Sequence, residues 1–116
     1  MKKLIRDKIP DIAKEQGRTL EIEIADKYSV PMYAIEKVQE ELNEVINSKT
    51  REELLEELAD LYEILDKYIE VMDFTKKDIQ KARKDKNEKA GAFHNNLILI
   101  KKNSNWQIFF FVLSFN

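Results

Sequence analysis

The chain has 116 residues, with 20 Lys and Arg against 22 Asp and Glu, so its formal net charge is only −2. It has no cysteine and one histidine, which excludes a disulfide framework, a thiolate zinc site and an imidazole metal cluster. The length fits one domain, and the near-zero charge gives no electrostatic basis for binding nucleic acid. Any chemistry is therefore expected to rest on carboxylates and amines.

No segment of the chain is typical of a targeting signal or a membrane span. Charged residues follow Met1 before any apolar region develops. The longest apolar run, residues 108–113, is far shorter than the ~20 residues that cross a bilayer. We therefore expect a cytoplasmic protein with no membrane partner.

The N-terminal part of the chain predicts a short helix followed by a strand. Residues 6–16 contain Pro10 near their start and precede Gly17, a pattern typical of a short helix or turn. Residues 19–24 alternate polar and apolar side chains, which is the period of a half-buried strand. A loop is expected over residues 26–30.

Two long helices joined by a short loop are predicted for the middle of the chain. Pro31 is well placed to begin the first helix, over residues 31–48. The second helix is predicted over residues 51–72, and Thr50 and Glu53 have the spacing of a capping box. The apolar stripes of the two helices consist of Ile35, Val38, Leu42, Val45 and Ile46, and of Leu54, Leu58, Leu61, Leu65 and Met72. Because the loop is short, the helices are expected to form an antiparallel hairpin.

The C-terminal part predicts one further helix and a β-hairpin. Thr75 is expected to cap a helix over residues 76–89 that ends near Gly91. Residues 97–100 and 106–113 are rich in β-forming side chains, and Asn and Ser separate them, as in a hairpin.

Residues 103–116 differ in composition from the rest of the chain. They contain no Asp, Glu, Lys or Arg, and exposed apolar residues of this kind would form an aggregation-prone edge. We therefore expect residues 1–102 to form the domain and residues 103–116 to be an extension that packs on this domain or in a subunit interface.

The acids of the two central helices follow the same pattern. Glu41 and Glu44 lie three residues apart on the first helix, as do Glu57 and Asp60 on the second. At about 100° per residue, each pair lies on one side of its apolar stripe and can share one cation. Oxygen ligands without His or Cys favour Mg²⁺ or Mn²⁺ over zinc. The pattern predicts a Mg²⁺ site for a phosphorylated ligand; its alternative is a solvated face with ordinary surface charges.

These acids and the N-terminal residues resemble a known family. Glu41-Leu42-Asn43-Glu44 and Glu57-Leu58-Ala59-Asp60, with twelve residues between them, match the ExxE…ExxD signature of the MazG-like all-α nucleoside triphosphate pyrophosphohydrolases. Residues 3–10, Lys-Leu-Ile-Arg-Asp-Lys-Ile-Pro, resemble the Lys-Leu-Val-Arg-Asp-Lys-Ile-Pro opening of their phosphoribosyl-ATP pyrophosphohydrolase-like branch. The resemblance covers roughly residues 3–100 and includes the run over 84–93.

The resemblance implies an enzyme that hydrolyses the α–β phosphoanhydride of a nucleoside triphosphate, or of a related phosphorylated nucleotide, to a monophosphate and pyrophosphate. Its cofactor would be Mg²⁺, held by both motifs, which activates a water for in-line attack on the α-phosphorus. The implied site consists of catalytic carboxylates (Glu41, Glu57, Glu40 and Glu56), metal ligands (Glu41, Glu44, Glu57 and Asp60) and phosphate-binding bases (Lys37, Arg6, Lys8 and Lys86). For each base, a surface charge or an ion pair is the alternative role. House-cleaning of non-standard nucleotides is the expected task.

Two features depart from the family pattern. The family usually has Arg-Gly-Gly-Phe where this chain has Ala90-Gly91-Ala92-Phe93, and its core normally ends near residue 99 or 100. The missing Arg and the uncharged extension favour a second hypothesis, a non-catalytic helical interaction module that retains the scaffold.

We therefore expect a mainly α-helical fold around a helix hairpin over residues 31–72, with a small β element made of the N-terminal strand and the C-terminal hairpin. Two such hairpins would form a four-helix bundle around the acidic site in a homodimer. A homotetramer is the alternative assembly.

Overall fold

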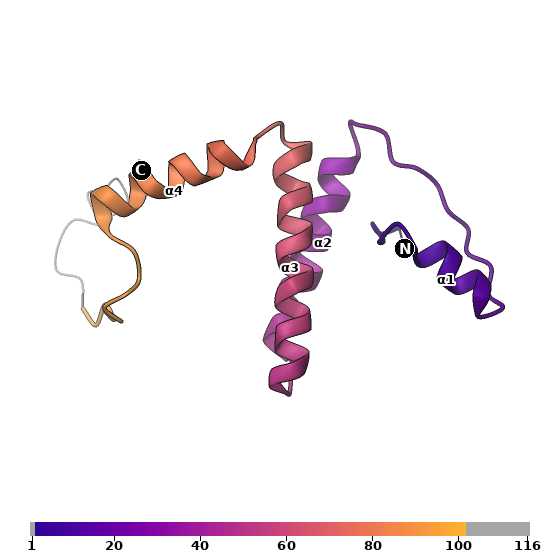
Figure 1. Cartoon of the computed structure of the whole chain (residues 1–116), viewed down its shortest axis with the longest axis horizontal. Helices are drawn as coiled ribbons and strands as arrows, with labels where there is room; N and C mark the ends of the chain where they lie inside the picture. The colour runs from indigo at the N-terminus through magenta and orange to yellow at the C-terminus, as the bar shows by residue number, and fades with distance from the viewer. Residues whose placement is uncertain (1, 102–116) are drawn as a thin grey trace. The chain divides into compact units, whose positions relative to one another are not determined.

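The computed structural model describes residues 2–101, which contain four α-helices and no strand (Figure 1). The helices are α1 (Ile9–Glu15), α2 (Val30–Asn47), α3 (Arg51–Val71) and α4 (Lys76–Ala90). The mainly helical class predicted from the sequence is therefore confirmed. Among these residues, no helix combines the length and the apolar character needed to cross a membrane.

The chain divides into two compact units, Met1–Asp73 and Phe74–Asn116. The first unit holds α1, α2 and α3, and the second holds α4. The predicted boundary between residues 1–102 and 103–116 lies at the edge of the described part of the chain and stays a prediction.

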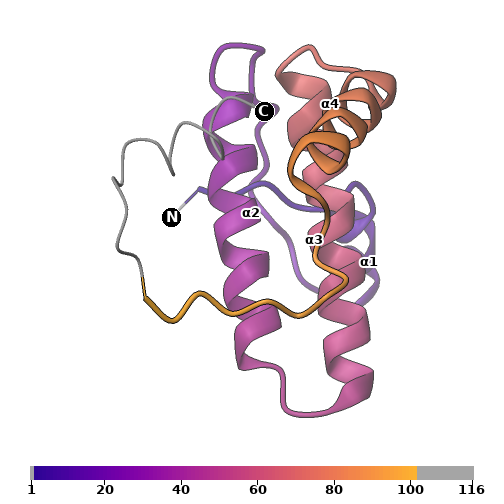
Figure 2. The ribbon, with the colours of Figure 1, turned by 90° about the vertical axis from the view of Figure 1, so that its left-hand side faces the viewer.

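The helices α2 and α3 form an antiparallel hairpin at the centre of the first unit (Figure 2). Their bounds agree with the predicted ones to within one residue at each end. Pro31 lies in the first turn of α2, where its missing N–H costs no helical hydrogen bond. The loop between Asn47 and Arg51 is too short for any arrangement other than a tight reversal, which places the two helices side by side.

Thr50 caps the N-terminus of α3. Its Oγ1 accepts a hydrogen bond from the backbone N–H of Glu53 at 3.1 Å. In return, Oε2 of Glu53 accepts a hydrogen bond from the backbone N–H of Lys49 at 2.9 Å. The predicted spacing therefore produces a cap, although the reciprocal bond reaches Lys49 instead of Thr50.

We expect Thr50→Ala to lower the free energy of unfolding of the first unit by about 1 kcal/mol, because the helix loses the acceptor for an otherwise unpaired N–H group. Urea unfolding followed by circular dichroism measures this change. Thr50→Ser keeps the hydroxyl and should retain most of the stability. Equal losses in the two variants would show that the hydroxyl does not stabilise α3.

The helix α4 agrees with the predicted bounds to within one residue, whereas α1 begins at Ile9, three residues after the predicted start. Gly17, which follows α1, and Gly91, which follows α4, both have positive φ angles, of 75° and 82°, a conformation that favours glycine. Thr75 and Asp78 exchange two hydrogen bonds, at 3.1 and 2.8 Å, and form the capping box of α4. Within the described part of the chain, α4 has no buried residue.

The predicted N-terminal strand is not formed. Residues 19–24 have no regular secondary structure, and the side chains of Ile22 and Ile24 are 49% and 97% exposed. A strand needs a neighbouring strand to pair its backbone N–H and C=O groups, and none lies within residues 2–101. Alternating side chains alone cannot supply that partner.

The predicted C-terminal hairpin is only partly within the described residues. Residues 97–100 have no strand, and Leu97, Ile98 and Ile100 are each more than four-fifths exposed. Residues 106–113, its second segment, and the whole 103–116 extension lie outside the described part of the chain.

The hairpin covers only part of its own apolar surface. Ala34 of α2 and Ile64 of α3 are buried. Six members of the predicted apolar stripes are more than one-third exposed, and we call them the apolar face: Ile35, Leu42, Ile46, Leu58, Leu65 and Met72. Two helices bury only the sides that face each other, so a surface of this extent remains open in a single hairpin.

Candidate metal centre

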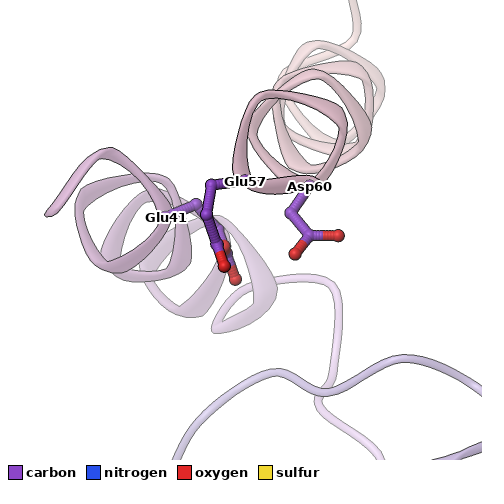
Figure 3. Close-up of side chains that lie close together, drawn as sticks. All are labelled: Glu41, Glu57 and Asp60. Atoms are coloured by element: carbon purple, nitrogen blue, oxygen red, sulfur yellow. The ribbon is translucent and has the colours of Figure 1, made fainter. Parts of the chain in front are cut away.

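Three carboxylates from the two central helices lie close together (Figure 3). Glu41 comes from α2, and Glu57 and Asp60 come from adjacent turns of α3. One carboxylate oxygen of each residue lies within 4.8 Å of those of the other two. We call these residues the acidic triad. Three of the four predicted metal ligands therefore converge.

The remaining predicted acids surround the acidic triad but do not belong to it. Glu44 and Glu56 are exposed, and Glu40 is half-buried. Glu44 and Glu56 lie close enough to Glu57 for their charges to raise its pKa. They are therefore neighbours of the site in this structure, whereas Glu44 was predicted as a ligand and Glu56 as a catalytic carboxylate.

Glu41 is a buried carboxylate, with 8% of the residue exposed. A buried carboxylate is stable only with a counter-charge or with hydrogen-bond donors. Lys37, one turn earlier on α2, supplies that charge: its Nζ lies 3.3 Å from Oε1 of Glu41 and 3.3 Å from Oε1 of Glu40. One ammonium group thus forms ion pairs with two carboxylates. This agrees with the predicted position of Lys37, one helical turn before Glu41.

Glu40 is held in its ionised form by two lysines. Burial acts to raise its pKa, but the hydrogen bonds and charges of Lys37 and Lys3 outweigh this and hold the pKa below its ordinary value. A carboxylate with a lowered pKa is a weak proton acceptor. Glu40 is therefore better suited to holding Lys3 and Lys37 in position than to removing a proton from water.

Glu57 has the opposite environment. Burial and the negative charges of Glu44, Asp60, Glu41 and Glu56 all raise its pKa, and within residues 2–101 it forms no ion pair. The folded chain therefore concentrates more negative charge here than its own bases offset. A divalent cation would relieve this repulsion, and a donor set made only of carboxylate oxygens fits Mg²⁺ or Mn²⁺.

The raised pKa of Glu57 makes one contribution to the way in which stability depends on pH without metal. The folded chain holds this proton to a higher pH than the unfolded chain, in which the pKa has its ordinary value of 4.5. The contribution of Glu57 to stability therefore falls as the pH rises from 4.5 through the pKa of Glu57 in the folded chain. Above that pKa the contribution is constant.

We expect Glu57→Gln to remove this fall. In EDTA, its Tm relative to wild type should be higher at pH 7 than at pH 4, as measured by differential scanning calorimetry. Glu63→Gln makes the same charge change at an exposed position of α3 and should show a smaller difference. The same change in relative Tm between pH 4 and pH 7 in both variants would contradict a raised pKa at Glu57.

The N-terminal segment, residues 2–8, brings two further bases to these acids. Nη2 of Arg6 lies 2.7 Å from Oδ1 of Asp60, and Nζ of Lys3 lies 3.3 Å from Oε1 of Glu40. Arg6 was predicted as a site residue and Lys3 was not, although Lys3 is the first residue of the same motif. The two ion pairs connect a segment without regular structure to α3 and α2.

The other two predicted phosphate-binding bases are Lys8 and Lys86, and their predicted role stays a prediction. Lys8 is exposed at the start of α1, and no ion pair involves it within residues 2–101. Lys86 lies on α4 in the second unit. Within the described residues of the first unit, Arg6 and Lys37 are the predicted bases that contact members of the acidic triad.

The near-neutral net charge of the chain conceals a separation of charge. Residues 1–73 contain 19 acidic and 11 basic side chains, whereas residues 74–116 contain three acidic and nine basic ones. The unit that carries the acidic triad is thus strongly negative, which attracts cations to its surface.

Comparison with models of protein families, with curated proteins and with solved structures gives no match for this chain.

Proposed function

We propose that this protein is a Mg²⁺-dependent nucleoside triphosphate pyrophosphohydrolase that acts in the cytoplasm. The observation that carries the proposal is the acidic triad, in which carboxylate oxygens from two helices lie within 4.8 Å of one another. The triad consists of residues to which the family resemblance assigns metal binding. The resemblance of residues 3–10 supports the same conclusion, because Lys3 and Arg6 of that motif contact acids of this site.

In this proposal the residues of the site have distinct roles in binding the metal and the substrate. Glu41, Glu57 and Asp60 would hold Mg²⁺, which when bound supplies charge to polarise the phosphate oxygens and lowers the pKa of a coordinated water. Lys37, whose Nζ lies 3.3 Å from Oε1 of Glu41, balances the charge of that carboxylate. Arg6 and Lys37 provide positive charge next to the carboxylates, where a triphosphate substrate would place its negative oxygens.

Incubating the full chain with a panel of standard and modified nucleoside triphosphates tests this function. We expect release of pyrophosphate, together with the nucleoside monophosphate, in the presence of Mg²⁺ and no release after addition of EDTA. Release of orthophosphate instead would indicate cleavage at a different phosphoanhydride. No release from any substrate, together with no stabilisation by Mg²⁺, would refute the proposal.

We further propose that the protein is a homodimer in which two hairpins form a four-helix bundle, with a homotetramer as the alternative. The apolar face supports this assembly, since its six side chains are more than one-third exposed in one chain. A second hairpin could cover them by the packing that stabilises helix bundles. The assembly would also reduce the access of water to the hairpin on which the carboxylates lie.

The second candidate function is a non-catalytic interaction module. Two observations favour it: Lys37 and Arg6 already neutralise part of the acidic triad, and Ala90 stands where the family usually has an Arg. The assay above separates the two candidates, because such a module forms its assembly without releasing pyrophosphate.

A further inference from the structure

Arg6 is paired with a carboxylate that the proposed function assigns to the metal. Its Nη2 lies 2.7 Å from Oδ1 of Asp60, a member of the acidic triad. Lys3 of the same segment contacts Glu40, which lies outside the triad. Arg6 and Lys3, two of the basic residues of the N-terminal segment, therefore contact acids with different expected roles.

A divalent cation and Arg6 would compete for Asp60. A cation bound by the acidic triad lies about 2 Å from its carboxylate oxygens, and therefore only a few ångströms from a guanidinium paired with the same carboxylate. At this separation two positive charges repel strongly. Either the cation binds less tightly, or Arg6 leaves Asp60.

Of these two outcomes, the structure favours the one in which the Arg6 side chain leaves Asp60. The side chains of Arg6 and Asp60 are 60% and 38% exposed, and exposed ion pairs contribute little to stability. Arg6 also lies in a segment without helix or strand, so no regular structure has to break. The cation would not compete for Glu40, which lies outside the acidic triad, so the contact of Lys3 with Glu40 does not have to break.

We propose that Arg6 binds two anions in turn: Asp60 when the acidic triad holds no cation, and a phosphate group of the substrate when it does. The planar guanidinium, with its fork of N–H donors, fits carboxylate and phosphate equally well. Arg6 thus neutralises the free site and then binds the substrate that arrives with the metal. This inference rests on the proposed function and adds an exchange of partners at one residue.

The exchange predicts that substitution of Arg6 raises the affinity for Mg²⁺ and lowers the affinity for pyrophosphate. In Arg6→Gln, Mg²⁺ alone should bind about two- to fivefold more tightly, because Asp60 has lost its competing cation. Pyrophosphate, in the presence of saturating Mg²⁺, should bind at least about tenfold more weakly, because a charged hydrogen-bond donor is missing. Isothermal titration calorimetry of the full chain measures both affinities without any turnover, and circular dichroism checks the fold.

Lys3→Gln is the matched control, because it removes the same charge from the same segment without touching the acidic triad. It should change both affinities less than Arg6→Gln does. Equal effects of the two variants would show that only net charge matters and would overturn the inference. An unchanged Mg²⁺ affinity in Arg6→Gln, or a shift of both affinities in the same direction, would overturn it as well.

Failure of this inference can be distinguished from failure of the proposed function. If wild type binds Mg²⁺ and releases pyrophosphate from a nucleotide but Arg6→Gln binds Mg²⁺ as wild type does, only the exchange is refuted. If wild type binds no Mg²⁺ and releases no pyrophosphate, both are refuted.

Discussion

Glu57→Gln is expected to lower the rate of pyrophosphate release from a nucleoside triphosphate by about 10³-fold, since metal stabilisation of charge in the transition state is worth several kcal/mol. Burial and the charges of four neighbouring carboxylates raise the pKa of Glu57, a member of the acidic triad. The substitution keeps the size of the side chain and replaces an anionic ligand by a neutral one. Steady-state kinetics at saturating Mg²⁺, with pyrophosphate as the detected product, measures the effect.

Glu63→Gln is the control for this experiment. It makes the same chemical change on α3 at an exposed position outside the acidic triad, and it should retain nearly full activity. Circular dichroism should show a folded protein for both variants. Retained activity in Glu57→Gln would show that the triad is not the catalytic metal site.

Ile46→Glu is expected to weaken the proposed homodimer by about a hundredfold. Ile46 is 70% exposed in the single chain, so a charge there costs the folded monomer little. In the four-helix bundle each dimer loses two buried Ile side chains, and each is worth on the order of 1–2 kcal/mol at this exposure. Sedimentation equilibrium over a range of concentrations gives the dissociation constant.

Asn47→Glu is a matched control, since it adds the same charge at the adjacent residue, about 100° further round the helix. Asn47 is exposed and does not belong to the apolar face. The dissociation constant of the Asn47→Glu dimer should therefore be close to that of the wild-type dimer. A wild-type protein that stays monomeric at high micromolar concentration, or a dimer that Ile46→Glu leaves intact, would contradict the proposed assembly.

The helical elements were predictable because their signals are local. Pro31 at the start of α2, Thr50 and Thr75 as N-terminal caps, and Gly91 after α4 act through residues within about one helical turn. The strand over residues 19–24 was not predictable in the same way. Alternation shows that a segment can be a strand, whereas a strand forms only when a distant segment pairs with its backbone.

The site was predictable only in part, for a related reason. Helical periodicity places Glu41 and Glu44 on one side of α2, but it does not say how α2 is rotated or tilted against α3. That packing brings Glu41 to Glu57 and Asp60 and leaves Glu44 exposed. Lys3 and Arg6 pair with acids 37 and 54 residues away, and no spacing rule relates residues at such distances.

The sequence by itself determined that this protein is mainly helical, that its central helices form a hairpin, and that its candidate chemistry rests on carboxylates. Each of these follows from composition, helical period or a local cap. Only the tertiary structure decided which three carboxylates meet, that one of them is buried, and that Arg6 contacts one of them. Those outcomes depend on how separate segments pack, and the packing is set by many contacts at once.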